Sequence, residues 1–286
     1  MADVRLGLIG CGRLAERGYV PAAHRARGVR LTAVADQVLQ RCENVAPGTP
    51  AFASAAELLA AGAADALVLA TPAAAHVADA RLAAAAGVPT LIEKPPAPTA
   101  RAAEALAGLE PMPFVGFNRR FEPALRELRD QAVAASRVEM DLVFRRRSGS
   151  WASYESADPV ALDLGPHLVD LVFWLAEAEP ARVQGRADEN ELELEIELAQ
   201  GRGSARIECV LGRSYREVVD VRGIGSFTRG GLRSALAARR ESPLVASLAL
   251  QLESFARAAR GGERDRDLAT AADGVRVMRA LECVTS

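Results

Sequence analysis

The sequence predicts an α/β protein of two domains, a doubly wound parallel sheet followed by an α/β domain with a large open, mostly antiparallel sheet. Up to residue 117, apolar strand-like runs alternate with alanine-rich helical stretches, as in a βαβ series. From residue 118 onward, one helix and then a run of alternating strands follow. The predicted domains are therefore 1–117 and 118–286, with a last helix, about 268–286, packing near the first domain.

The first strand and its turn predict a dinucleotide site. Val4–Ile9 forms a buried strand, and a glycine-rich turn of the pattern GxGxxA separates it from a helix. Gly10 permits the tight turn, Gly12 lets the backbone approach a pyrophosphate, and small Ala15 lets the helix pack closely. The first domain is thus a Rossmann domain, and its predicted cofactor contacts in this turn are Gly10, Gly12, Arg13 and Leu14.

The next strand, Val29–Ala35, is followed by Asp36. This residue lies about 20 residues after the glycine-rich turn, which is the spacing expected of an acid that binds the ribose. A carboxylate there binds the ribose hydroxyls and repels a 2′-phosphate. Asp36 therefore favours NAD, although Arg41 could still reach the phosphate of NADP.

Three further strands, 65–70, 88–93 and 112–117, alternate with helices near 55–61, 74–86 and 100–109. Polar residues follow these strands, at the edge where open parallel sheets bind ligands. We expect Thr71, Pro72, His76, Glu93 and Lys94 to contact the cofactor, and Asn118 to lie at the same edge. For His76, which opens a helix, a structural role is the alternative.

Lys94 is the only lysine among 35 basic side chains. A guanidinium can replace a surface ammonium, but not a compact ammonium that approaches a reacting oxygen. Its position after a predicted strand therefore indicates a chemical role. The following Lys94–Pro95 bond can also adopt the cis form.

The second domain carries Asp163, His167 and Asp170 at spacings that share one face of a helix. Pro166 suits the first turn of that helix, which places Asp163 at or just before its N-cap. A histidine flanked by carboxylates can take up and return a proton near neutral pH, as alcohol oxidation requires. Capping or solvation is the alternative role for the two aspartates.

Together these motifs resemble the Gfo/Idh/MocA oxidoreductases, the glucose-fructose oxidoreductase and inositol dehydrogenase group. The resemblance covers almost the whole chain and rests on five segments, Gly7–Gly12, Thr71-Pro72 with His76, Glu93-Lys94-Pro95, Gly116–Phe121 and Asp163–Asp170. It implies catalysis by a lysine, an aspartate and a histidine, which correspond here to Lys94, Asp163 and His167.

The resulting hypothesis is an NAD(P)-dependent oxidoreductase acting on a hydroxyl or carbonyl of a sugar, polyol or nucleotide-sugar. His167 would exchange the proton, Lys94 would stabilise charge on the same oxygen, and Asp163 would bind a neighbouring hydroxyl or orient the histidine. Predicted substrate contacts are Asn118, Arg119, Trp151, Asp163 and His167. A non-catalytic NAD(P)-sensing regulator, an NAD-dependent glycosidase and an imine reductase remain alternatives.

Composition excludes several classes of partner. A net charge of −2 favours neither nucleic acid nor an anionic membrane. The N-terminus has no leader pattern and no stretch has 18 apolar residues, so we expect a cytoplasmic protein. The four cysteines lack zinc-site spacing, and we expect no metal.

The strands of the second domain predict its surface. Runs 138–145, 191–198 and 218–222 alternate apolar with largely charged residues. A dry interface would bury carboxylates at several kcal/mol per ion. We therefore expect a monomer, or a homo-oligomer joined by a wet, salt-bridged sheet contact.

Overall fold

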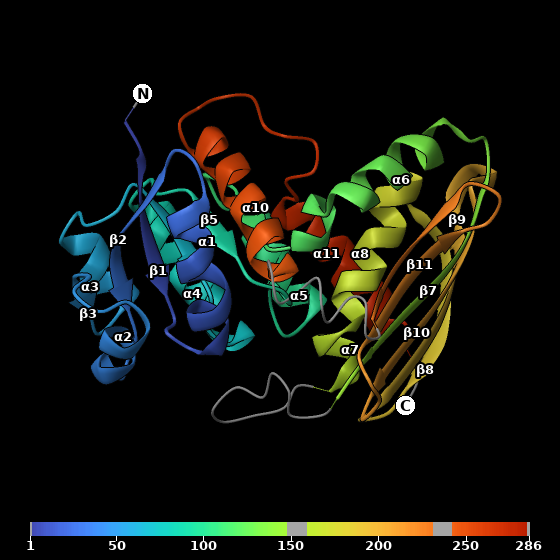
Figure 1. Ribbon diagram of the computed structural model, residues 1–286, viewed down its shortest axis with the longest axis horizontal. Coiled ribbons are helices and arrows are strands. Elements are labelled where there is room, and N and C mark those ends of the chain that lie inside the picture. Colours follow the sequence, from blue (N-terminus) through green and yellow to red (C-terminus); the bar gives the residue numbers. More distant parts are fainter. Residues whose placement is uncertain (1, 148–158, 231–241, 285–286) are drawn as a thin grey trace. The chain divides into compact units, whose positions relative to one another are not determined.

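The computed structural model describes residues 2–147, 159–230 and 242–284 (Figure 1). The chain forms two compact units, the first of residues 1–118 and 242–275 and the second of residues 119–241 and 276–286. The chain thus leaves the first unit near residue 118 and returns to it for one long helix. No helix within the described ranges is long and apolar enough to cross a bilayer.

Sheet A of the first unit consists of six parallel strands in the order β3-β2-β1-β4-β5-β6, as the sequence predicts for a Rossmann domain. They are β1 (Val4–Ile9), β2 (Val29–Ala35), β3 (Ala51–Phe52), β4 (Ala66–Leu69), β5 (Thr90–Ile92) and β6 (Phe114–Val115). The strand order reverses between β1 and β4. Ligands bind open α/β sheets beyond the carboxyl ends of the strands at such a reversal.

The helices of this unit connect the strands as crossovers. They are the π-helical turn η1 (Ala15–Tyr19), α1 (Val20–Arg25), α2 (Leu39–Val45), α3 (Ala55–Ala60), α4 (Ala73–Ala85) and α5 (Ala100–Ala107). The Ser54 and Thr99 side chains accept hydrogen bonds from the first turns of α3 and α5, which explains where these helices begin.

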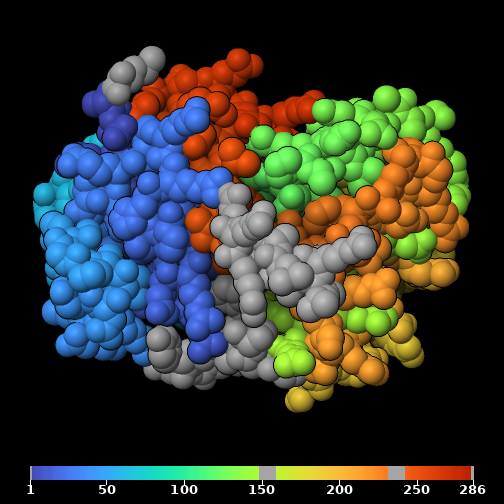
Figure 2. All heavy atoms as spheres, viewed as in Figure 1, coloured from blue at the N-terminus to red at the C-terminus, as the bar shows by residue number. Residues whose placement is uncertain are grey.

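The long helix α10 (Pro243–Ala259) returns to the first unit and packs on η1 and α1. In Figure 2 the orange-red atoms of this segment lie directly beside the blue N-terminal segment. A Cβ at Gly18 would lie 2.9 Å from Cδ1 of Leu248, so a larger residue there would force the Leu248 side chain to move. The Arg27 backbone N–H also donates to Glu253 at 3.0 Å.

Sheet B of the second unit has six strands in the order β12-β11-β7-β10-β9-β8, of which only β7 and β10 pair in parallel. The strands are β7 (Val138–Arg146), β8 (Pro180–Ala187), β9 (Glu191–Leu198), β10 (Gly203–Leu211), β11 (Arg216–Val221) and β12 (Gly225–Gly230). The helical segments are η2 (Asn118–Phe121), α6 (Pro123–Ala134), α7 (Val160–Asp163), α8 (Gly165–Ala176), η3 (Ala199–Gly201) and α11 (Ala271–Glu282), of which η2 and α11 extend across the unit boundaries. The predicted large, mostly antiparallel sheet is therefore confirmed.

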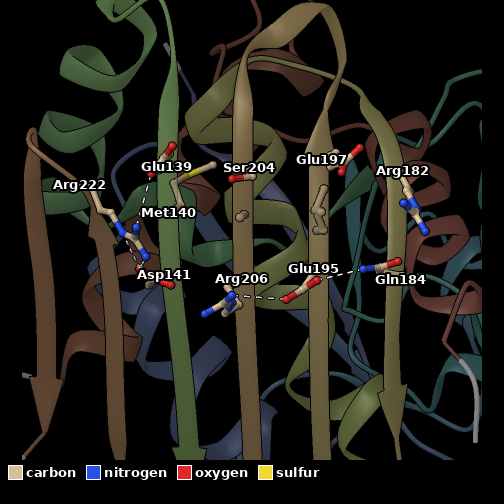
Figure 3. Close-up of a pocket in the computed structure, with 12 residues that line it drawn as sticks. Glu139, Met140, Asp141, Arg182, Gln184, Glu195, Glu197, Ser204, Arg206 and Arg222 are labelled. Carbon is tan, nitrogen blue, oxygen red and sulfur yellow. Dashed lines mark hydrogen bonds and ion pairs between the residues drawn. The ribbon is translucent and has the colours of Figure 1, made fainter.

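One face of sheet B is buried and the other is charged. Its buried side chains include Val138, Met140, Leu142 and Phe144 of β7 and Leu192, Leu194, Ile196 and Leu198 of β9. The helix α8 packs on β7 and β10 and is buried over almost its whole length. The opposite face carries the charged side chains that the alternation predicts, among them Glu139, Asp141, Glu195 and Glu197 (Figure 3).

Candidate functional site

The glycine-rich turn lies between β1 and η1. Gly10 has φ +95°, and a Cβ there would lie 2.7 Å from the carbonyl oxygen of Ala70, so no other residue fits without strain. A Cβ at Gly12 would have no atom within 4 Å. Gly12 therefore leaves open space above the turn, as a cofactor phosphate requires. Arg13 and Leu14, which precede η1, are half-buried.

The Asp36 carboxylate braces this turn from the end of β2. One oxygen accepts from the Cys11 backbone N–H at 2.9 Å, and the other accepts from Val38 N–H at 2.9 Å. The Arg41 guanidinium lies 3.8 Å from the same carboxylate. A carboxylate has about four acceptor positions, so Asp36 keeps capacity for ribose hydroxyls. The nearby Arg41 guanidinium is the group that could bind the 2′-phosphate of NADP.

Thr71, Pro72 and His76 follow β4. The Oγ1 of Thr71 is buried without a hydrogen-bond partner in the described structure. Nε2 of His76 lies 2.8 Å from the Thr71 carbonyl oxygen, and Nδ1 lies 3.2 Å from the Pro96 carbonyl oxygen. The imidazole thus bridges the loops after β4 and β5. Because its ring is only 1% exposed, the geometry favours the structural alternative for His76, and cofactor contact stays a prediction.

Glu93 and Lys94 follow β5. The Glu93 carboxylate is buried, accepts a hydrogen bond from the Tyr19 hydroxyl at 2.5 Å, and accepts another from the Lys94 backbone N–H at 3.0 Å. The Lys94–Pro95 peptide bond is cis, the form that the sequence allows. Lys94 is half-buried. Tyr19 carries no motif signal and was not among the predicted residues.

Asn118 closes the first unit. Its Nδ2 donates to Ser247 Oγ at 3.0 Å, and the side chain is 5% exposed. This contact joins the end of the β6 segment to α10 within the first unit. It accounts for the buried amide, while contact of Asn118 with substrate stays a prediction.

Asp163 and His167 lie in consecutive helices of the second unit. Asp163 ends α7 and Leu164 is the N-cap of α8, so Asp163 stands just before that cap, as predicted. Pro166 occupies the first turn of α8. Nη2 of Arg146, at the end of β7, donates to Asp163. The His167 ring stacks at a tilt on Phe144, with centroids 6.0 Å apart.

A second charged pair lies next to Phe144. The Arg119 guanidinium lies 5.3 Å from the ring centroid of Phe144 and 3.1 Å from Glu217. Glu217 is completely buried and also accepts from the Tyr215 hydroxyl at 2.9 Å. Arg119 was predicted to contact substrate, whereas Glu217 was missed. Its spacing with Val219 and Val221 on one strand face is the signal that could have identified it.

Asp170 is engaged within the second unit. Arg120 donates to both of its oxygens, at 2.9 and 2.5 Å, and the two side chains are almost completely buried. This bidentate pair fastens η2 to α8. Asp170 therefore supports the helix that carries His167.

Trp151 falls outside the described residues, so its predicted role with substrate has no structural counterpart here. The open face of sheet B carries a shallow hollow of about 270 Å³ lined by charged residues (Figure 3). That face is opposite to the one covered by α8, so the hollow does not belong with His167.

Comparison with known proteins matches residues 4–111 to the family model GFO_IDH_MocA, the oxidoreductase family with an NAD-binding Rossmann fold. The chain is 29% identical to the rhizopine catabolism protein MocA of Rhizobium meliloti, over 100% of this chain and 95% of that protein. It is 33% identical to the inositol 2-dehydrogenase of Leifsonia xyli subsp. xyli, over 64% of this chain and 56% of that protein.

Among solved structures, the chain resembles GenD2 from gentamicin A biosynthesis, crystallised in complex with NAD. The TM-score is 0.83 and the identity 20%, over 99% of this chain and 93% of the other. At this identity the likeness establishes a shared fold.

Proposed function

Because residues 4–111 match the Gfo/Idh/MocA oxidoreductase family model, we propose that the chain oxidises a hydroxyl or reduces a carbonyl of a sugar, polyol or nucleotide-sugar with a nicotinamide cofactor. The observation that carries the proposal is the strained Gly10 turn with open space at Gly12, beside the lone lysine at the same edge of sheet A. The name of the inositol 2-dehydrogenase relative supports a polyol-like substrate.

The first unit fits such a cofactor. Gly10 and Gly12 would hold the pyrophosphate, Asp36 the ribose, and the unpartnered buried hydroxyl of Thr71 offers a further polar contact within the described structure. When bound, the nicotinamide would accept or donate a hydride, that is, two electrons and one proton. We propose NAD as the preferred cofactor because Asp36 stands where a ribose-binding acid is expected, and its carboxylate would repel a 2′-phosphate. Arg13, Leu14, Pro72, His76, Glu93 and Lys94 complete the proposed cofactor-binding set.

His167 is the proposed general base in oxidation and general acid in reduction. An imidazole exchanges protons near neutral pH, and the alcohol proton must leave as the carbon is oxidised. The tilted stacking on Phe144 and the rigid, buried helix α8 limit the orientations of the ring. Proton transfer depends on such orientation.

Lys94 is proposed to stabilise the charge that develops on the same oxygen, which an ammonium can do as a point charge. Asp163 is proposed to bind a neighbouring substrate hydroxyl or to orient His167. Its ion pair with Arg146 compensates its charge and holds the carboxylate at the end of α7. Asn118, Arg119 and Trp151 are the further proposed substrate contacts.

A panel of polyols, sugars and nucleotide-sugars tests this proposal, with formation of reduced nicotinamide followed by absorbance for NAD and NADP separately. We expect turnover with at least one member of the panel, a preference for NAD, and losses of about 100-fold or more in kcat for Lys94→Ala and His167→Ala. Absence of turnover with every substrate, together with tight NAD binding, would instead support the non-catalytic sensor.

The two remaining alternatives give different products. An NAD-dependent glycosidase would release sugar from a glycoside without net accumulation of reduced cofactor. An imine reductase would consume reduced cofactor only when an amine and a carbonyl compound are both present. Product analysis by mass spectrometry therefore separates these reactions from alcohol oxidation.

A further inference from the structure

Glu93, the residue before Lys94, forms a buried hydrogen-bonded pair with Tyr19. The Tyr19 hydroxyl donates to Glu93 Oε1 at 2.5 Å, and the two side chains are 1% and 6% exposed. Loss of water raises the pKa of Glu93, while the Tyr19 hydroxyl and the nearby Lys94 charge act in the opposite direction. Burial of a carboxylate is costly, and an apolar residue would pack here without that cost. The pair therefore calls for an explanation other than packing.

The second carboxylate oxygen is directed to the lysine. Glu93 Oε2 accepts from the Lys94 backbone N–H at 3.0 Å. Gly116, which directly follows β6, leaves room for this arrangement, since a Cβ there would lie 3.0 Å from Glu93 Oε1. One carboxylate thus connects Tyr19 to the backbone of Lys94, and its charge interacts with that of the Lys94 ammonium.

Tyr19 reaches Glu93 from the helix that follows the glycine-rich turn. It is the last residue of η1, a π-helical turn that holds one residue more per hydrogen-bonded ring than an α-helix. Such turns are rare and are frequent at functional sites. The hydrogen bond consequently joins the segment after Gly12 to the segment that carries Lys94, all within the first unit.

We propose that Tyr19 and Glu93 are positioning residues that fix the backbone and the ammonium of Lys94. The inference rests on the proposed function in one respect, namely that Lys94 takes part in the reaction. The physical statement, that the Tyr19 hydroxyl controls the surroundings of the Lys94 side chain, does not depend on any substrate. In this role Glu93 acts through Lys94, alongside its proposed contact with the cofactor.

The single lysine makes a direct test possible. Protein grown with lysine labelled with ¹³C at Cε gives one methylene signal, which belongs to Lys94. Tyr19→Phe removes only the hydroxyl, and Glu93→Gln removes the charge with little change of shape. We expect each variant to shift the ¹³Cε signal, and the double variant to shift it no further than Glu93→Gln alone, since the two side chains act as one unit.

Leu58→Val serves as the matched control, because Leu58 is completely buried in the same unit and its loss of volume lowers stability without touching Glu93. It should leave the ¹³Cε signal in place. With a substrate in hand, Tyr19→Phe should lower kcat by about 10- to 100-fold with little change in KM for NAD, as misplacement of a reacting group does.

Folded Tyr19→Phe and Glu93→Gln proteins whose Lys94 signals coincide with that of the wild type would overturn the inference. A shifted signal without any turnover of the substrate panel would uphold the positioning pair while contradicting the proposed enzymatic function. If Tyr19→Phe does not fold, the Glu93→Gln arm decides the matter alone.

Discussion

At the scale of single residues, burial keeps His76 neutral across most of the acidic range. Loss of water lowers the pKa of its imidazole to about 4, although the Thr71 and Pro96 carbonyls oppose the shift. The unfolded chain binds this proton below about pH 6.5. The unfolded state therefore binds more protons between about pH 6.5 and 4, and stability must fall as the pH falls through that window. The loss from this residue is at most about 3 kcal/mol.

Urea denaturation at several pH values between 7 and 4 measures this effect. His76→Gln keeps a polar side chain but cannot titrate, so its free energy of unfolding should fall less steeply over the window. The exposed His24 provides the matched control as His24→Gln. Equal slopes for the wild type and His76→Gln would contradict the assignment of His76 as a neutral bridge.

Lys94 supports a second prediction at the residue scale. Reductive methylation can modify only this side chain and the N-terminus, because the chain has no other lysine. Dimethylation keeps the charge but adds bulk at the nitrogen, so activity should collapse, and bound NADH should protect it. The number of added methyl groups is read by intact mass. Full turnover after complete labelling would exclude Lys94 from the reaction.

The sequence could identify the candidate site residues that carry motifs, but not their partners. Gly10, Asp36 and Lys94 stand at fixed distances from strand ends, so local pattern is sufficient to find them. The Tyr19 hydroxyl bonds to Glu93, 74 positions away in the sequence, and Arg119 pairs with Glu217, which is also distant in the sequence. Such pairs depend on tertiary packing, which a single sequence without that context does not specify.

At the scale of elements, the ion pair of Arg120 and Asp170 connects η2 to α8, the helix that carries His167. Removal of the Asp170 carboxylate takes away both charge-assisted hydrogen bonds that it makes with a buried guanidinium, so Asp170→Ala should lower the free energy of unfolding by about 3–5 kcal/mol. Denaturant titration measures this loss. The exposed pair of Arg186 and Glu193 is the control, and Arg186→Ala should change stability little.

The double variant completes this test. Replacement of both Arg120 and Asp170 by apolar residues of similar size should recover a substantial part of the lost stability, because no unpaired charge then remains buried. A double variant that is destabilised by the sum of the single losses would show that packing, and not charge compensation, is what Asp170 provides.

The elements themselves were predictable where apolar runs end at glycine or a charged residue. The predicted Val4–Ile9 and Val29–Ala35 match β1 and β2 residue for residue. The strands near residues 65–70, 88–93 and 112–117 are shorter in the structure, and α2, β3 and the π-helical form of η1 were not predicted. These last elements are too short for hydrophobic periodicity to mark them.

At the scale of the whole molecule, the open face of sheet B is the surface from which we predict the oligomeric state. Its charges are paired within the face: Arg222 lies 2.9 Å from Asp141, and Arg206 lies 3.5 Å from Glu195 (Figure 3). Those side chains are largely exposed, so water and dissolved salt screen their charges. A dry contact would remove that solvation from every carboxylate at once.

We therefore predict a monomer, or a dimer whose sheet contact is wet and salt-bridged. A contact of that kind weakens as salt screens its ion pairs, because the screening length falls from about 10 Å at 0.1 M to about 3 Å at 1 M. Light scattering at both concentrations should give the monomer mass throughout, or a dimer that dissociates at the higher one. A dimer that is insensitive to salt would show that an apolar surface holds the copies together, and it would refute the prediction for this face.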